Sequence, residues 1–397
     1  MGENASWLMI PVPPLLRGRR GGSRRSRWIV LSLALVLVLA GLPGCGTGAR
    51  PILKIGLSAP FTGWDEPMGY DVIHAVRLAV RERNQRGGAG GYTIELAALD
   101  DRNEPAEAAQ QARELAVDPD ILGAVGGLDN EAVLAAAAEY HKAALPLIAV
   151  AATAARLTDQ GFAEIFRLAP RDEALAQATV ELAASRLQAK RVAVVQDPAE
   201  AGLGTAFQRA APLGGLTVVY VGEVRRWQLD FGNLVAALGA QQPDVVLFAG
   251  RVSEAGPFLA ACRAAGLHFA FVGGPAVDDA RLGQLAGTVA ESVFVLGLAG
   301  PATGSSFPRD YASMAGHAPG ARAALAYDAT GVLLSAIERA AGGGRPTRAR
   351  VQVELSRTRG YTGVTGEISF DRRGDNTGAR PVVYSLSGKD YPGSVVR

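Results

Sequence analysis

Short apolar runs alternate along most of the chain with longer segments in which apolar residues recur at helical spacing. The clearest unit spans residues 121–159, where the run Ile121–Val125 ends in two glycines, the Ala-rich segment Glu131–Ala144 follows, and the run Leu147–Val150 ends in small residues. This pattern predicts a strand, a helix and a second strand. In a right-handed βαβ unit both strands run the same way, so the turns after them share the carboxyl edge of the sheet, where open α/β sheets bind ligands.

The same alternation continues through the rest of the chain. Further strands are predicted at Ile52–Pro60, Tyr92–Leu99, Arg191–Gln196, Leu216–Val221, Asp244–Phe248, Phe269–Gly273, Val293–Leu298 and Pro381–Leu386. Further helices are predicted at Tyr70–Gln85, Arg171–Leu187, Thr205–Leu213, Phe231–Gln241, Pro257–Ala265, Leu282–Ala286, Ala323–Ala341 and Thr347–Arg357. Two such sets of similar size indicate an α/β fold with two lobes, parallel sheets covered by helices, and a cleft between the lobes.

The N-terminal residues 1–45 have the features of a targeting segment. An arginine-rich stretch precedes the apolar run Trp28–Ala40, which is too short to span a bilayer comfortably. The following residues Leu42, Pro43, Gly44 and Cys45 resemble the lipobox of bacterial lipoproteins, with Cys45 as the lipidated residue and Pro43 as a departure from the usual pattern. An uncleaved anchor helix is the alternative.

Charge and cysteine content restrict the function further. Without its first 44 residues the chain has 34 Lys and Arg against 37 Asp and Glu, and a slightly acidic protein is not expected to bind nucleic acid. Cys262 is the one other cysteine and lies in a small-residue helical segment, so we expect a packed thiol and no disulfide within the mature chain.

No catalytic constellation is recognisable. The four histidines lack metal-ligand spacing, and neither a G-x-S-x-G elbow nor a phosphate-binding P-loop is present. The paired acids Asp100–Asp101 and Asp278–Asp279 lie in predicted turns and are more typical of helix caps. We therefore expect neither an enzyme nor a bound metal or cofactor.

An ordered set of motifs resembles one family across nearly the whole mature chain. The motifs are KIGLSAPFTG, RNQRGG, LDDRNEP, AATAARLT, FRLAPRDEALA, RVAVVQD, ACRAAGL and TGEISFDRRGD. In this order they are similar to the solute-binding proteins of ABC importers for leucine, isoleucine and valine, with the type I fold of periplasmic binding proteins. The resemblance implies two Rossmann-like lobes that close on a small solute at a hinge. It places lobe one at 51–170 plus 297–380, and lobe two at 171–296 plus 381–397.

The resemblance also implies positions for the ligand site. Ala151 and Thr153 match the residues that hold the ligand's α-carboxylate. Asp172 matches an acid that receives the α-ammonium, and Trp64 lies where the family packs a side chain against the ligand, although an ordinary surface aromatic is equally compatible. Asp129, followed by the polar Asn130, stands where a serine or threonine is expected, and Arg251 stands where a tyrosine is expected.

These departures leave three interpretations open. The alignment slips by one or two residues in the turns, or the ligand differs, with Arg251 binding an anion and Asp129 facing a cationic or hydroxylated group. Alternatively, Asp129 and Arg251 form a salt bridge across the closed cleft. Such a bridge would favour closure without a solute.

The expected function is that of an extracytoplasmic, lipid-anchored receptor for an amino acid or a related small carboxylate or amide. Its expected partners are the solute and the membrane permease of an ABC importer, and a monomer is the simplest state. The alternative is a sensory receptor that passes its signal to a separate protein.

Overall fold

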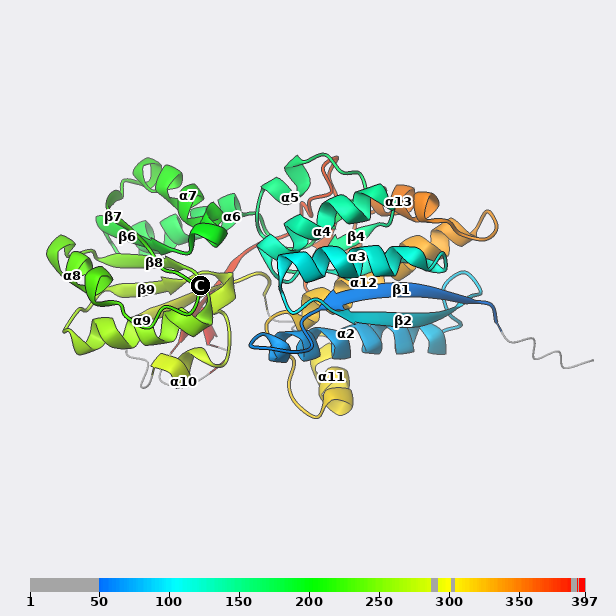
Figure 1. The fold of residues 1–397 in the computed structure, drawn as a ribbon, viewed down its shortest axis with the longest axis horizontal. Helices are drawn as coiled ribbons and strands as arrows, with labels where there is room; N and C mark the ends of the chain where they lie inside the picture. Colours follow the sequence, from blue (N-terminus) through cyan, green and yellow to red (C-terminus); the bar gives the residue numbers. More distant parts are fainter. Residues whose placement is uncertain (1–49, 287–291, 301–303, 387–390, 392, 397) are drawn as a thin grey trace, which may run out of the picture. The chain divides into compact units, whose positions relative to one another are not determined.

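The computed structural model describes residues 50–286, 292–300, 304–386, 391 and 393–396, which belong to one compact unit of residues 50–397. Its two larger sheets form the centres of two lobes (Figure 1). Lobe one is built on a parallel five-stranded sheet of order β2-β1-β3-β4-β5. Its strands are β1 (Ile52–Ala59), β2 (Thr93–Asp100), β3 (Ile121–Gly126), β4 (Leu147–Ala149) and β5 (Ile165–Arg167). Every residue of β3 is buried, as expected of a strand covered on both faces.

Helices cover both faces of this sheet. Helices α2 (Glu66–Gln85), α12 (Ala323–Ala341) and α13 (Arg348–Ser356) pack together on one face, and α3 (Pro105–Val117) and α4 (Asn130–Lys142) pack on the other (Figure 1). The remaining elements of this lobe are α5 (Arg156–Asp159), α11 (Phe307–Ala315), β11 (Tyr361–Gly363) and β12 (Gly366–Ile368). Helix α12 returns from the second lobe and is buried along most of its length, which explains its apolar sequence.

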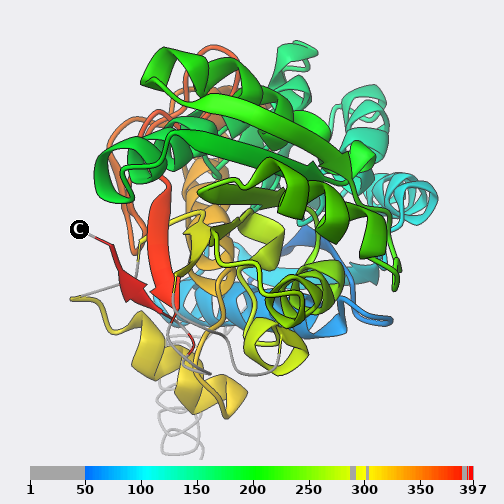
Figure 2. The ribbon, with the colours of Figure 1, turned by 90° about the vertical axis from the view of Figure 1, so that its left-hand side faces the viewer.

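Lobe two is built on a seven-stranded sheet of order β14-β13-β10-β9-β8-β6-β7. Its strands are β6 (Arg191–Gln196), β7 (Thr217–Glu223), β8 (Val245–Ala249), β9 (Ala270–Gly273), β10 (Val293–Gly297), β13 (Val382–Leu386) and β14 (Ser394–Val395). The prediction of parallel pairing is correct for β6 to β10 and wrong for β13, and β14, which was not predicted, is also antiparallel to its neighbour. Strand β13 pairs antiparallel with β10 because it enters from lobe one in the opposite direction (Figure 2, red).

The helices of lobe two are α6 (Asp172–Glu181), α7 (Ala201–Ala210), α8 (Gly232–Gln241), α9 (Val252–Ala264) and α10 (Leu282–Ala286). Helix α6 continues into a π-helical segment, Leu182–Arg186, and short 3₁₀ turns occur at Pro198–Glu200, Pro212–Gly214 and Pro275–Val277. Helices α6 and α7 pack together on one side of the sheet, and α8, α9 and α10 pack on the other.

Several predicted helix starts are too late. Helix α2 begins at Glu66, α7 at Ala201 and α9 at Val252. The predicted start of α9 was Pro257, a residue type that is common in first turns, but Pro257 lies inside the helix. The correction makes Arg251 the residue that immediately precedes α9. Strand β5 and helix α11 were not predicted, and β5 is too short to show a period.

Among the described residues no helix is long and apolar enough to cross a membrane. The predicted signal segment and Cys45 lie outside the described residues.

Candidate functional site

A cavity of about 60 Å³ lies between the lobes at the carboxyl ends of β3, β4 and β8. Six of the seven ligand-site residues expected from the sequence line it, namely Asp129, Asn130, Ala151, Thr153, Asp172 and Arg251. Trp64 does not line it. Glu200, Met68, Asn103 and Arg322 also line the cavity and were not predicted. The fold therefore brings the predicted set together from turns that are up to 122 residues apart in the chain.

Arg251 is the centre of the site. Its Nη2 lies 2.5 Å from Oδ2 of Asp129 and 3.7 Å from Oε1 of Glu200, and its Nη1 lies 3.5 Å from Oδ2 of Asp65. Arg251 and Glu200 come from lobe two, whereas Asp129 and Asp65 come from lobe one. Of the interpretations left open by the sequence, the structure therefore contains the salt bridge across the closed cleft.

The turns of lobe one are ordered by their own polar side chains. Asp129 caps α4, with its Oδ1 accepting a hydrogen bond of 3.0 Å from the backbone N–H of Ala132. Asn130 reaches across to the turn after β4, where its Oδ1 accepts from the N–H groups of Thr153 at 2.9 Å and Ala154 at 3.0 Å. Both turns thus present a fixed backbone to the cavity.

Glu200 occupies the lobe-two side of the cavity, with 13% of its side chain exposed. Its Oε2 accepts a hydrogen bond of 2.7 Å from Nδ2 of Asn130, a contact between the lobes. Burial and the negative charge of Asp129 raise the pKa of Glu200 to about 8, despite the opposing charge of Arg251. The Glu200 carboxyl is therefore largely protonated at neutral pH.

The raised pKa of Glu200 predicts a pH-dependent stability. The folded state holds a proton on Glu200 between its ordinary pKa of 4.5 and about 8, so this group's contribution to stability falls as the pH rises through that range. Glu200→Gln cannot ionise, so its gain over the parent chain should be near zero below about pH 4.5, grow by about 1.4 kcal/mol for each pH unit above that, and level off above about pH 8 at no more than about 5 kcal/mol. Thermal unfolding of both chains across this range measures the difference. The exposed Glu223→Gln should show no such trend, and parallel curves for Glu200→Gln and the parent would contradict the prediction.

Asp172 begins α6 and is 3% exposed. Its backbone N–H donates to the carbonyl of Thr153 at 3.0 Å. This bond joins the first residue of α6 to the turn after β4 that contains Thr153 and Ala154, called the site turn below. Its side-chain Oδ1 has no hydrogen-bond partner among the described residues. Burial raises the pKa of Asp172, and the neighbouring hydroxyl of Thr153 opposes this effect in part.

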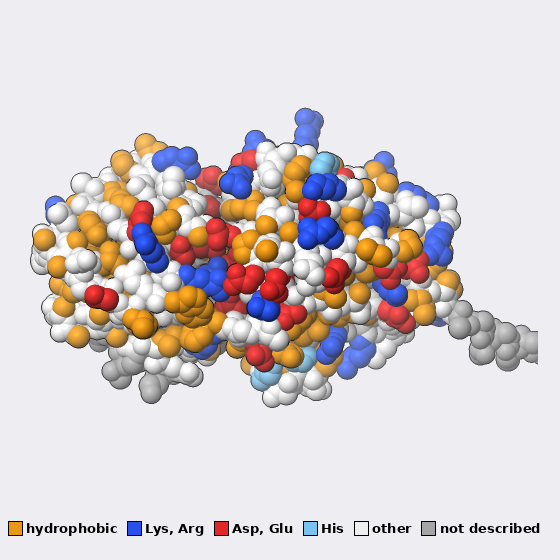
Figure 3. Space-filling model, in the orientation of Figure 1, with side chains coloured by type: hydrophobic (Ala, Val, Ile, Leu, Met, Phe, Trp, Pro, Cys, Tyr) orange, Lys and Arg blue, Asp and Glu red, His pale blue; other side chains and the backbone are white. Residues whose placement is uncertain are grey.

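Contacts at the rim hold the two lobes together. The rings of Trp64 and Trp227 meet edge to face with centroids 5.5 Å apart, and Nη1 of Arg281 donates to the backbone carbonyl of Trp64 at 2.8 Å. Arg226 forms an ion pair of 3.0 Å with Glu104. Charged side chains of both signs gather where the lobes meet (Figure 3). Trp64 is 41% exposed and packs against the other lobe at this rim.

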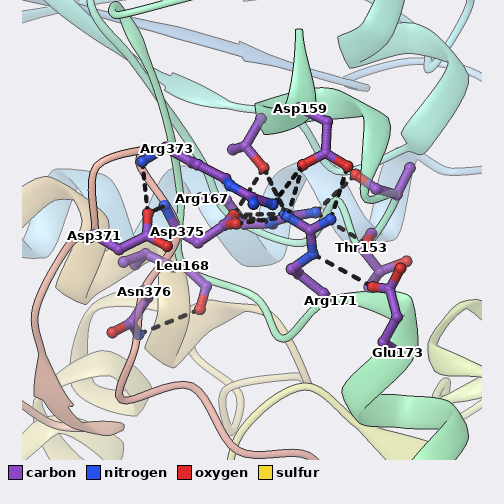
Figure 4. A network of polar contacts seen from close by, with 12 residues as sticks. Thr153, Asp159, Arg167, Leu168, Arg171, Glu173, Asp371, Arg373, Asp375 and Asn376 are labelled. Carbon is purple, nitrogen blue, oxygen red and sulfur yellow. Dashed lines mark hydrogen bonds and ion pairs between the residues drawn. The ribbon is translucent and has the colours of Figure 1, made fainter. Parts of the chain in front are cut away.

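A buried network supports the site turn from behind (Figure 4). Arg167, which is 0% exposed, donates from Nη1 to the carbonyls of Thr153 at 3.0 Å and Ala154 at 2.7 Å. Its Nε donates to Oδ1 of Asp375 at 2.9 Å, and Arg171 donates to Oδ2 of the same carboxylate at 2.8 Å. Burial opposes ionisation of Asp375, but the two guanidinium groups outweigh it and lower the pKa. The network joins the connection between β5 and α6 to the segment that precedes β13.

The described residues contain no group of three His, Cys, Asp or Glu side chains placed to hold a metal ion. Two acids of the site, Glu200 and Asp65, were not predicted, although the sequence gives a weak indication of both. Both lie in turns that follow predicted strands, but nothing in the sequence shows which of several turn acids becomes buried.

A family model described as periplasmic binding protein matches residues 52–386. The chain belongs to this family. Periplasmic binding proteins are receptors rather than enzymes, and membership implies a location outside the cytoplasm. The family resemblance and the fold expected from the sequence are thereby confirmed.

Relatives of this periplasmic binding protein include an amino acid binding protein from Pseudomonas aeruginosa, 30% identical over 64% of this chain and 68% of the relative. A Leu/Ile/Val-binding protein homolog from Brucella melitensis is 27% identical over 87% of this chain and 94% of the relative. The solved structure of a leucine binding protein from Thermotoga maritima is 28% identical, with a TM-score of 0.76 over 87% of this chain and 97% of that chain.

Proposed function

We propose that this protein is the solute receptor of an ABC importer and binds its solute by closure of the two lobes. The observation that carries the proposal is the cavity itself, which is lined from both lobes by polar residues that Arg251 links across the cleft. Because these residues come together only when the lobes meet, binding and closure are coupled. The names of the amino acid and Leu/Ile/Val-binding relatives support transport as the purpose of binding.

The membrane partner follows from the same proposal. The closed lobes would dock on a permease, and lipidation at Cys45 would hold the receptor at the membrane surface close to it. We further propose the lobe boundaries at 170/171, 296/297 and 380/381 and a monomeric state. The ligand would be received by Asp129, Asn130, Ala151, Thr153, Asp172 and Arg251, with Trp64 at the rim.

The test is a binding and closure experiment on the full chain in mild detergent. Amino acids, amines, amides and small carboxylates are screened by thermal unfolding, where a solute at 100 times its Kd should add about 2.7 kcal/mol to the free energy of unfolding. Nitroxide labels at Val117→Cys in lobe one and Leu213→Cys in lobe two, both highly exposed, report the interlobe distance. The labelled chain also carries Cys45→Ser, and Cys262 is buried, so the nitroxide reagent reacts with the two introduced cysteines. A solute that stabilises the chain and narrows the distance distribution supports the proposal, and failure of the whole panel contradicts it.

A further inference from the structure

The part of the chain that the structure describes contains two tryptophans, and both lie at the rim of the cleft on different lobes. Trp64 precedes α2 in lobe one, and Trp227 lies in the lobe-two loop 224–231 between β7 and α8. Their rings meet edge to face with centroids 5.5 Å apart. Neither residue lines the cavity, so their contact joins the lobes without taking part in the solute site itself.

Trp227 is held in a backbone conformation that tryptophan ordinarily avoids. Its φ is 66°, in the left-handed region where a side chain with a Cβ atom is strained. A tryptophan that is 53% exposed on a surface loop would relax unless its surroundings fixed it. Strain of this kind persists where the contacts around a residue over-determine its conformation, as they do in clamps and switch regions.

Glu254 fixes this conformation from within lobe two. Its Oε1 accepts the backbone N–H of Trp227 at 2.8 Å, and its Oε2 accepts from Oγ of Ser253 at 2.7 Å. Glu254 is 3% exposed and has no ion pair with another described residue. Its position in the first turn of α9 lets the helix dipole offset part of the cost of burying this carboxylate. The rim loop is thereby attached to the start of α9.

A guanidinium group of lobe two packs on each of the two rings. Arg226 lies 5.3 Å from the ring centre of Trp227, and Arg281 lies 5.2 Å from that of Trp64. Arg281 also donates from Nη1 to the backbone carbonyl of Trp64 at 2.8 Å. The contact between Arg226 and Trp227 stays within lobe two, whereas every contact of Trp64 with lobe two exists only while the lobes meet.

Both tryptophans are tied to the ion pairs at the centre of the site. Trp64 is followed in the chain by Asp65, whose Oδ2 lies 3.5 Å from Nη1 of Arg251. Trp227 is bonded to Glu254, which lies in the first turn of the helix that begins directly after Arg251. Separation of the rim pair therefore displaces the same two segments that carry the ion pair between Asp65 and Arg251.

We propose that Trp64 and Trp227 form a latch that sets the lifetime of the closed cleft, with Glu254 as the positioning residue that presents Trp227. This inference rests on the proposed closure of the two lobes and adds the contact that controls how fast they reopen. The latch engages after the lobes have met, so its loss accelerates opening and leaves closing unchanged. A solute enclosed in the cavity leaves at the rate at which the latch opens.

Single-molecule energy transfer on the full chain in mild detergent measures both rates. Fluorophores are attached at Val117→Cys and Leu213→Cys in the Cys45→Ser background. Trp227→Ala should raise the opening rate about 10-fold because an aromatic pair is lost, and should leave the closing rate within about twofold. The control is Leu229→Ala, which lies in the same loop with an exposure of 88% and should open at the parent rate.

Two further comparisons separate a latch from a general loss of structure. Trp64→Ala should open as fast as Trp227→Ala, and the double variant should open no more than about twofold faster than either, because each change removes the same contact. Glu254→Ala should raise the opening rate at least about threefold. Glu254→Gln keeps a side-chain oxygen for the N–H of Trp227 and should restore the parent rate. If Glu254→Ala does not fold, the tryptophan variants decide.

The outcomes separate the latch from the receptor function. Opening rates of Trp64→Ala and Trp227→Ala that equal the parent rate overturn the latch and leave the receptor function standing. The latch is also overturned if the effects of the two changes multiply in the double variant, since the tryptophans then act independently. A parent chain that stays open with every compound of the solute panel contradicts closure, and with it the receptor function.

Discussion

Arg251→Met should open the cleft. The substitution keeps most of the side-chain volume but removes the positive charge that Asp129, Asp65 and Glu200 share in the closed form. Removing one partner of a buried ion pair costs about 3–5 kcal/mol, and in this case the cost applies only while the lobes are closed. When the lobes separate, water solvates the released carboxylates. The ratio of closed to open molecules should therefore fall by roughly 100-fold or more.

Electron-electron distance measurements between labels at Val117 and Leu213 would detect this change as a longer and broader interlobe distance. Arg226→Met is the matched control, because Arg226 also bridges the lobes but its side chain is 31% exposed and its partner Glu104 is 44% exposed. An exposed pair contributes about 1 kcal/mol at most, so the control should remain near the parent distance. Equal distances in the parent chain and Arg251→Met would contradict the role of Arg251 in closure.

Asp375→Asn should cause the largest loss of stability. Arg167 is fully buried and its Nε and Nη2 both donate to Oδ1 of Asp375, so the neutral amide leaves a buried guanidinium without its counter-ion (Figure 4). Arg171 loses a partner at the same time. The expected cost is about 3–5 kcal/mol in the free energy of unfolding. Because Arg167 also holds the carbonyls of Thr153 and Ala154, the site turn should loosen as well.

Chemical unfolding of the full chain measures the stability loss, and hydrogen exchange at the N–H groups of Thr153 and Ala154 measures the loosening. The control is Asp120→Asn, which removes the ion pair between Asp120 and Arg345. That pair is exposed, so the control should cost no more than about 1 kcal/mol. The prediction is wrong if the two variants are equally stable.

Apolar periodicity determined most of the fold. Helix α12 occupies the predicted range Ala323–Ala341, and strand β6 occupies the predicted range Arg191–Gln196. These segments succeed because burial on one or more faces forces a period of 3.6 or a continuous apolar run into the sequence. The starts of α2, α7 and α9 were predicted too late because glycine, proline or charged residues in or next to their first turns interrupt the apolar period.

The sequence was less informative about how the site residues interact. The family resemblance placed Asp129 and Arg251 in the ligand site, and a salt bridge between them was one of three interpretations. Nothing in the sequence indicated that Arg167 is buried, because an arginine at the end of an apolar run ordinarily lies at an exposed strand end. Its burial depends on Asp375, which lies 208 residues further along the chain.

The sequence by itself determined the two-lobed α/β fold, the family, and which turns face the cleft, since strand order and polarity place turns at a sheet edge whatever their partners. Only the tertiary structure decided that Arg251 is engaged by three carboxyl groups and that Asp129 and Asn130 accept from backbone N–H groups of the site turns. It also decided that Oδ1 of Asp172 has no hydrogen-bond partner among the described residues. The physical reason is that the strength and direction of charge interactions depend on distance and burial. Both are set by contacts between residues from two lobes that meet only in the folded chain.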